Sequence, residues 1–353
     1  MSNPTFDKRL QNLPASVWEK IAQIDELKGR WVGGARLSPQ TLGRLKRSVL
    51  ITSTGASTRI EGAKLSDADI ERLLRGISIQ HFSDRDKQEV QGYYELLTNV
   101  FDVWEPLKFS ESLIKHFHAE LLKYVGKDQP HRGEYKRHEN KVHMIDATGQ
   151  SIGVLFDTTP AWLTGKEMQE LVQWTTDALT QKSHHPLLII ATFIVQFLQI
   201  HPFQDGNGRL SRVLTNLLLL QAGYAYLPYV SHEKLIEDNK PDYYMALRAS
   251  QKTFNTDAED ILPWLAFFLG VVYAQSKQAL ALLSGENLEQ LLSPTQLKVW
   301  VYMQQRSDVS PKELSESLSI PRPTINQVVN RLMALQKIER FGLGRATRYR
   351  LRS

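Results

Sequence analysis

Cysteine is absent from this 353-residue chain. That absence excludes disulfide bonds, thiolate zinc sites and thiol nucleophiles. Long hydrophobic runs are also scarce: the longest, residues 187–200, has 14 residues and contains three polar side chains, whereas a bilayer span needs about 20 apolar residues. The first residues lack the charged-then-apolar pattern of a secretory signal. We therefore expect a soluble, cytoplasmic protein without a membrane segment.

The composition is that of a globular protein, with 42% hydrophobic and 23% charged residues. Its net charge of +5 is unevenly distributed. Residues 321–353 contain eight Arg or Lys against Glu339 alone, which gives this segment +7 and the remaining 320 residues −2. Any attraction to a polyanion is therefore expected of the C-terminal segment and not of the body of the chain.

Helical periodicity dominates the chain and predicts a mainly α fold. Strand character is confined to residues 141–155, where residues 146–149 separate two short apolar runs, so a β-hairpin is expected there. The expected helices are 67–75 after an N-cap at Ser66, 87–104, one that begins at Ser110, 167–179, 186–200 and 210–221.

A different pattern follows a connector at residues 280–293. Helices are expected at 295–305, after a Ser310 cap and at 323–335, followed by a ribbon of 338–341 and 347–351 across a Gly342-Leu343-Gly344 turn. Three helices and a ribbon predict a winged helix-turn-helix.

The polar residues of this C-terminal segment favour contact with a phosphate backbone. Winged helices also serve in protein interaction and dimerisation, which is the alternative. The third helix carries Asn326, Gln327, Asn330 and Arg331 opposite its apolar stripe, and Arg348, Arg350 and Arg352 share one face of the ribbon.

Residues 201–212, His-Pro-Phe-Gln-Asp-Gly-Asn-Gly-Arg-Leu-Ser-Arg, lie between two predicted helices. Two glycines allow backbone N–H groups to turn toward one point at a helix N-terminus, which makes an anion site. Asn207 adds a side-chain donor, and Arg209 and Arg212 add positive charge for a polyphosphate. Phe203 is interpreted as a core anchor of the loop.

Two further side chains in this stretch suit phosphoryl or nucleotidyl transfer. Asp205 offers a hard oxygen ligand for a magnesium ion that bridges phosphate oxygens. His201, at the end of the preceding helix, can take a proton from an incoming hydroxyl. Positioning and charge neutralisation supply most of the catalysis in such reactions.

The stretch resembles the Fic signature HPFxDGNGRxxR at every specified position. The resemblance implies a Fic helical core and transfer of AMP from ATP to a Tyr, Thr or Ser hydroxyl of a protein, with release of pyrophosphate. The roles it implies are general base for His201, magnesium ligand for Asp205, anion-binding loop for Gly206, Asn207 and Gly208, phosphate contact for Arg209 and γ-phosphate contact for Arg212.

Gly208 favours AMP transfer, because a branch of the same superfamily that phosphorylates its target has Lys at this place. A second resemblance lies upstream: Ser57-Thr58-Arg59-Ile60-Glu61-Gly62 is similar to the inhibitory [S/T]xxxE[G/N] motif of Fic proteins. It implies an N-terminal inhibitory helix that contributes Ser57 and Glu61. Glu61 paired with Arg212 would occupy the guanidinium meant for the γ-phosphate and repel that phosphate.

Two further features match the family by position. The predicted hairpin lies where Fic proteins have a flap that pairs in β-fashion with the target segment. Tyr243 and Tyr244 resemble the Tyr-Tyr segment near the adenine. By this resemblance, Tyr243, Tyr244 and Gln251 are expected to bind ATP. The family frequently has Asn seven residues after the second Tyr, where this chain has Gln251.

The chain is thus expected to have an N-terminal helical region with the inhibitory helix (1–105), a Fic catalytic core (106–280) and a winged helix-turn-helix (281–353). The expected function is an autoinhibited protein adenylyltransferase that uses ATP and Mg²⁺ and modifies a protein target, with a homodimer left open. Removal of AMP by the same site, with Glu61 aligning water, is one alternative. A nucleotide-sensing, DNA-binding regulator is the other.

Overall fold

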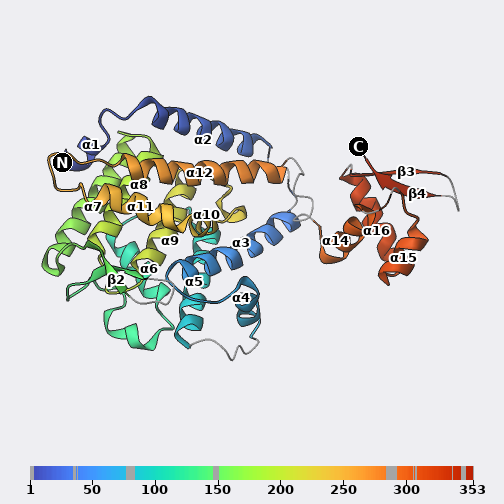
Figure 1. Ribbon diagram of the computed structural model, residues 1–353, viewed down its shortest axis with the longest axis horizontal. Coiled ribbons are helices and arrows are strands. Elements are labelled where there is room, and N and C mark those ends of the chain that lie inside the picture. Colours follow the sequence, from blue (N-terminus) through green and yellow to red (C-terminus); the bar gives the residue numbers. More distant parts are fainter. Residues whose placement is uncertain are drawn as a thin grey trace. The chain divides into compact units, whose positions relative to one another are not determined.

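Figure 1 shows the computed structural model of the chain, coloured from blue at the N-terminus to red at the C-terminus. It describes residues 4–34, 37, 39–76, 84–145, 151–283, 292–304, 306, 308–335, 337–342 and 347–352. The chain divides into two compact units, Met1–Leu283 and Ser284–Ser353. Each unit has a hydrophobic core of its own.

The first unit is built almost entirely from helices, which confirms the mainly α fold. Its helices are α1 (Pro4–Arg9), α2 (Ala15–Gly34), α3 (Pro39–Ile60), α4 (Asp67–Leu74), α5 (Asp84–Val103), α6 (Glu111–Leu121), α7 (Ala161–Gln181), α8 (Pro186–Ile200), α9 (Asn207–Gln221), α10 (His232–Asp238), α11 (Lys240–Gln251) and α12 (Leu262–Leu283), with short 3₁₀ turns η1 (Gly126–His131) and η2 (Leu227–Tyr229).

Caps set the beginnings of the helices that the sequence located best. The Ser66 hydroxyl accepts from the Asp69 N–H at 3.2 Å, and the Asp69 carboxylate accepts from the Ser66 N–H at 3.1 Å, so α4 begins with a complete capping box. Ser110 caps α6 with its hydroxyl alone, which accepts from the Leu113 N–H at 3.2 Å. Ser66 was predicted as an N-cap and Ser110 as the start of a helix; in both places the serine hydroxyl satisfies an amide that the helix leaves unpaired.

Three other helices of the first unit begin earlier than expected, and one of them is α5, which begins at Asp84 and not at residue 87. α7 begins at Ala161, not at residue 167. The sequence pattern missed its first turns because the first inward-facing residue is the polar Thr164 and the apolar pattern starts only at Met168. α9 begins at Asn207, not at residue 210, because the glycine loop itself forms the helix start. The expected connector at 280–293 also begins later, since residues 280–283 are the last turn of α12.

The antiparallel hairpin expected at 141–155 is present as β1 (Lys141–Ile145) and β2 (Ser151–Asp157), with Lys141 opposite Asp157. The turn predicted at 146–149 lies outside the described residues. Residues Asn140 and Thr158 therefore stand at the two ends of the hairpin, where it joins the helical body.

The core is centred on α8 and α9. Every residue of α8 except Pro186 and Gln199 is buried, and α9 buries all but Gly208 and Gln221. Because both helices are packed on all sides, the loop between them, residues 201–206, is held at both ends by buried structure.

α12 is long and apolar enough, by length and composition, to cross a membrane, and it is alone in this among the helices of the described residues. About half of its apolar window is buried inside this unit. It packs against α2, α8, α10 and α11, as expected of a core helix.

The second unit contains the three helices and the ribbon that the sequence predicts: α14 (Pro294–Gln304), α15 (Pro311–Leu318), α16 (Arg322–Ala334), β3 (Ile338–Phe341) and β4 (Arg348–Leu351). The strands pair antiparallel, with Ile338 opposite Leu351, and Val309 bridges to Tyr349. The glycine turn at 342–344 lies mostly outside the described residues. The assignment as a winged helix-turn-helix stays a prediction.

Candidate active site

The loop between α8 and α9 holds most of the predicted site residues. α8 is followed by His201, whose φ of 52° lies in the left-handed region, and α9 follows Gly206, whose φ is 81°. Asn207 closes the loop, because its Oδ1 accepts from the Phe203 N–H at 2.9 Å and its Nδ2 donates to the Phe203 carbonyl at 2.7 Å. The Asn207 amide, which was predicted to donate to an anion, therefore also donates to a carbonyl of its own loop.

Phe203 is fully buried, which confirms its prediction as a core anchor. Its ring stacks on His118 of α6, with 3.8 Å between the ring centroids. His118 Nδ1 accepts from the Gly133 N–H, so its Nε2 carries the proton and donates to the Asp205 carbonyl at 3.0 Å. Burial lowers the pKa of His118 to about 4, which keeps this supporting side chain neutral. The sequence does not single His118 out, since its partners lie on separate segments.

His201 is arranged as a proton acceptor. Its Nδ1 donates to the Leu198 carbonyl at 3.3 Å, a group that can only accept, so the lone pair is on Nε2. Burial lowers the pKa of His201 to about 4, and the nearby ammonium of Lys136 acts in the same direction. At neutral pH the imidazole is therefore uncharged and able to take a proton.

A cavity of about 100 Å³ opens beside this loop. It brings together residues from three parts of the sequence: the end of α8 with the loop and start of α9 that follow it, the residue directly after α3, and α11. Its lining is Glu61, Leu198, His201, Asp205, Gly206, Asn207, Gly208, Arg209, Tyr243, Tyr244 and Leu247.

Arg212 of α9 is buried and faces the end of α3. Its Nε donates to the Ser57 hydroxyl at 2.8 Å, and its Nη2 donates to the Ser57 carbonyl at 2.9 Å and to Glu61 Oε1 at 2.7 Å. This confirms the predicted pairing of Glu61 with Arg212 and shows why Ser57 accompanies it: the hydroxyl and the carbonyl of Ser57 aim the guanidinium at Glu61.

Gly208 allows Glu61 to approach the beginning of α9. A Cβ at position 208 would lie 2.3 Å from Glu61 Oε1, closer than two such atoms can come. The Glu61 carboxylate therefore occupies the positive end of the α9 dipole, a place that favours negative charge. In this structure Glu61 holds the location that the sequence predicts for a phosphate.

Arg209 and Asp205 belong to a network of charges that the sequence does not reveal. Arg209 pairs with Glu89 of α5 at 2.7 Å and with Asp205 at 3.1 Å, and Arg85 of α5 donates to Asp205 at 2.7 Å. Burial raises the pKa of Asp205, but Arg209, the Gly206 N–H and Arg85 outweigh it and hold that pKa below its usual range. Arg85 and Glu89 also pair with each other at i,i+4, so in the sequence they resemble an ordinary surface pair.

Tyr243 and Tyr244 line the cavity, and their rings meet at 5.1 Å and 63°. Tyr243 is buried against Trp264 and Phe267 as well, so it belongs to the core and to the cavity wall. Gln251, the last residue of α11, does not line the cavity. It is buried, and its Nε2 donates to the Val195 carbonyl at 3.1 Å.

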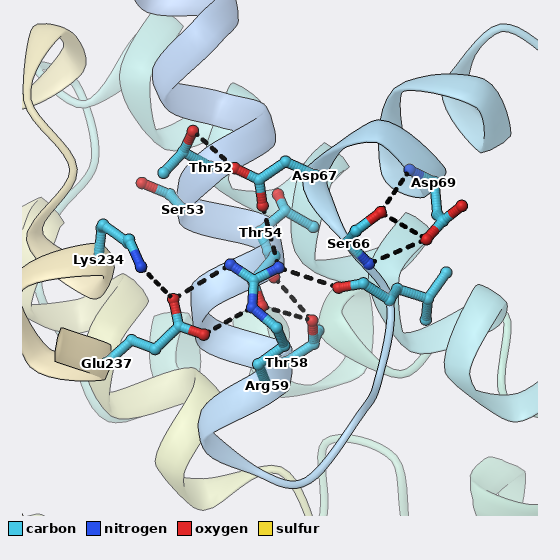
Figure 2. A network of polar contacts seen from close by, with 12 residues as sticks. Thr52, Ser53, Thr54, Thr58, Arg59, Ser66, Asp67, Asp69, Lys234 and Glu237 are labelled. Atoms are coloured by element: carbon cyan, nitrogen blue, oxygen red, sulfur yellow. Dashed lines mark hydrogen bonds and ion pairs between the residues drawn. The ribbon is translucent and has the colours of Figure 1, made fainter.

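The end of α3, which carries Glu61, is fastened by Arg59 (Figure 2). Arg59 forms a two-point ion pair with Glu237 of α10, at 2.6 and 3.1 Å, and bonds to Asp67 of α4 at 2.9 Å. It also donates to the Leu65 carbonyl at 2.9 Å. One guanidinium therefore joins the last turn of α3 to two neighbouring helices.

Comparison with known proteins identifies the central part of the chain. Residues 108–219, which include the whole 201–212 stretch, match the sequence profile of the Fic/DOC family. The chain contains a Fic domain. A solved structure of a Fic family protein from Desulfovibrio desulfuricans G20 has the same fold, with a TM-score of 0.63 and 24% identity over 97% of each chain.

Two curated relatives of this Fic domain carry the name protein adenylyltransferase Fic. The protein from Drosophila mojavensis is 28% identical over 252 residues, which are 70% of this chain and 44% of that protein. The protein from Drosophila virilis is 32% identical over 187 residues, 52% of this chain and 35% of that one. The matches thus span less than half the length of these relatives.

Proposed function

We propose that this chain is an autoinhibited protein adenylyltransferase, which moves AMP from ATP to a hydroxyl of a target protein. The names of its curated relatives support adenylyl transfer in general. The single observation that carries the proposal is the ion pair of Glu61 with Arg212 at the mouth of an anion site beside an uncharged histidine.

The transfer uses groups of this chain at each step. His201 Nε2 takes the proton of the acceptor hydroxyl, and the hydroxyl oxygen bonds to the α-phosphorus of ATP. The bond from that phosphorus to the bridging oxygen breaks, and pyrophosphate leaves. The N–H groups at the start of α9 and the guanidiniums of Arg209 and Arg212 offset the charge of the triphosphate. Tyr243 and Tyr244 form the wall on which the adenine would lie.

Asp205 is the residue that would hold Mg²⁺, which supplies charge neutralisation on the phosphate oxygens when bound. Its carboxylate lines the cavity and is 38% exposed. No cluster of three or more candidate metal ligands exists among the described residues. One carboxylate is nevertheless sufficient, because Mg²⁺ takes its remaining ligands from phosphates and water. Arg85, which donates to Asp205 Oδ2, would move aside when the metal binds.

Autoinhibition follows from what Glu61 occupies. The cavity measures about 100 Å³ with Glu61 in its wall, below the about 300–1,000 Å³ of most ligand sites. Its carboxylate also neutralises Arg212, the residue proposed for the γ-phosphate. ATP that enters this site would meet a negative charge where its last phosphate should lie.

The test is transfer of labelled AMP from ATP to proteins of a cell lysate. We expect Glu61→Gly to raise labelling by about tenfold or more, since removing the carboxylate frees Arg212, and Glu61→Gly/His201→Ala to abolish it. Mass spectrometry of the labelled bands then gives target and acceptor. Labelling by Glu61→Gly no stronger than by the wild type would refute autoinhibition.

Removal of AMP is the second candidate, because Glu61 and His201 line the same cavity and Glu61 could align a water. Proteins labelled by the Glu61→Gly variant supply the substrate for this assay. Release of free AMP on addition of wild-type protein, but not of Glu61→Gly, supports this use of the site.

For the second unit we propose contact with DNA through α16. Asn326, Gln327, Asn330 and Arg331 are exposed on this helix, opposite its buried face. Two arginines of the ribbon are less available for phosphate contacts than the sequence predicts. Arg348 pairs with Asp308 and Glu313, and Arg350 pairs with Glu339.

A fluorescence titration with duplex DNA at two salt concentrations tests this proposal. We expect the affinity to fall as salt rises. Arg331→Ala should weaken binding more than Arg350→Ala, which removes a paired arginine. Equal affinities at both salt concentrations would rule out contact with the phosphate backbone.

A further inference from the structure

Four consecutive carbonyl groups around His201 accept hydrogen bonds from one segment, residues 136–140. Lys136 Nζ donates to the Ile200 carbonyl at 3.1 Å, and the Lys136 N–H donates to the Pro202 carbonyl at 2.8 Å. Asn140 Nδ2 donates to the Phe203 carbonyl at 2.9 Å and reaches the His201 carbonyl at 3.5 Å. The backbone on both sides of the proposed base is therefore held by Lys136 and Asn140.

His201 needs such support because its backbone is left-handed, with φ of 52°. For a residue with a side chain this conformation is unfavourable by about 1–3 kcal/mol and persists only where the surroundings enforce it. It also directs the imidazole, since a turn of the backbone here would swing Nε2 away from the cavity. The bonds to Ile200, Pro202 and Phe203 oppose that turn.

Lys136 is buried, 4% exposed, and its ammonium has three acceptors: the Ile200 carbonyl, Asn140 Oδ1 at 2.8 Å and Thr158 Oγ1 at 2.9 Å. These satisfy its three N–H donors. Burial lowers the pKa of Lys136 to about 8, while Glu139 and Glu167 act to raise it. A buried charge with a complete set of partners is confined to one geometry, so it makes a stiff connection.

The same connection reaches the hairpin. Asn140 immediately precedes β1, and Thr158 immediately follows β2. The Thr158 hydroxyl lies 2.8 Å from the Asn140 carbonyl and 2.7 Å from Asn140 Oδ1, so the two ends of the hairpin are tied to each other as well as to Lys136. The base of the hairpin and the backbone of His201 thus share one set of hydrogen bonds.

We propose that Lys136, with Asn140 and Thr158, is a positioning residue that fixes the left-handed backbone of His201 and couples it to the base of the β1–β2 hairpin. The inference rests on the proposed function, in which His201 takes the proton and the hairpin is where the target would pair. Its consequence is that these residues govern turnover rather than the binding of ATP.

The experiment uses the full chain with Glu61→Gly, so that transfer is measurable. Lys136→Met keeps the length of the side chain and removes the charge. Thr158→Val removes the hydroxyl at constant shape, and Thr158→Ser keeps it. Lys166→Met, at an exposed lysine of α7, is the matched control.

We expect Lys136→Met to lower kcat by about 10- to 100-fold, the effect of a displacement of about 1 Å in a catalytic group. The KM for ATP should change less than about twofold. Thr158→Val should lower kcat, Thr158→Ser should restore it, and Lys166→Met should have no effect. An unchanged kcat, or a higher KM for ATP at unchanged kcat, overturns the proposal.

A crystal structure of Lys136→Met gives a readout that does not need activity. We expect the φ of His201 to leave the left-handed region, and a φ still near 52° overturns the proposal. If Lys136→Met does not fold, the Val and Ser variants at Thr158 give the same comparison. Absence of transfer by Glu61→Gly itself would defeat the proposed function, and the crystal structure would then decide this inference alone.

Discussion

At the scale of single residues, the site depends on two histidines that the fold keeps uncharged. His201 presents a free Nε2 to the cavity, and His118 supports the loop through Phe203 and Asp205. Burial lowers the pKa of each to about 4. In the unfolded chain both would return to about 6.5. The folded protein therefore binds fewer protons between these two values.

This difference predicts a loss of stability in mild acid. Between pH 6.5 and about 4 the unfolded state binds more protons, so the free energy of unfolding should fall as the pH falls through this window. Urea unfolding at pH 7.5, 6, 5 and 4.5 measures the slope. His201→Ala should reduce the slope relative to wild type, whereas an identical slope in both proteins would contradict the assignment.

At the scale of elements, α3 is fixed to its neighbours by polar contacts at the turn that carries Glu61. Arg59 connects it to Glu237 of α10 and Asp67 of α4 (Figure 2). Farther back, the Ser53 hydroxyl of α3 bonds to Ser231, at the start of α10, at 2.8 Å. The position of Glu61 therefore depends on ion pairs that are partly open to solvent.

We expect Arg59→Met to relax the inhibition. Loss of about 0.7 kcal/mol in holding Glu61 would raise AMP transfer about threefold, less than the effect expected of Glu61→Gly. In the Glu61→Gly background the same substitution should have no further effect, because no carboxylate remains to be held. Arg75→Met, which removes an exposed pair with Glu71 on α4, is the control. A rise in both backgrounds would show that Arg59 acts on something other than Glu61.

The elements also show how far the sequence could lead. The loop, its two glycines and the pairing of Glu61 with Arg212 were predicted, because each of the two motifs is concentrated in a short stretch of sequence. Lys136, Arg85 and Glu89 were not, because the residues of the 200–212 region that they contact lie 60 or more positions away and their local surroundings resemble a surface segment. Gln251 was expected to bind ATP although the family frequently has Asn at this place, and it lies outside the cavity lining, with its amide bonded to the Val195 carbonyl.

At the scale of the whole molecule, the two units have separate cores. Leu217 of α9 lies in the first and Leu332 of α16 in the second, and both are fully buried. Replacing either leucine with alanine removes about 2–5 kcal/mol from the core that contains it. The two substitutions should cost a similar free energy of unfolding, but each should destabilise a different unit.

Calorimetry should therefore resolve two transitions. We expect Leu217→Ala to lower the Tm of the first unit and Leu332→Ala to lower the Tm of the second. Below the first transition, Leu332→Ala and wild type should show about the same AMP transfer. A single transition that both variants shift equally would mean that the units unfold as one.

Glycine at position 208 connects two features of the site, the first turn of α9 and the position of the Glu61 side chain. A Cβ there would collide with the Glu61 carboxylate, 2.3 Å from Oε1. Because this carboxylate is the far end of a flexible side chain, a descendant gene that acquired a larger residue at this codon would keep Glu61 only in a shifted position. A substitution at this single codon would therefore change the surroundings of Glu61 together with those of the first turn of α9.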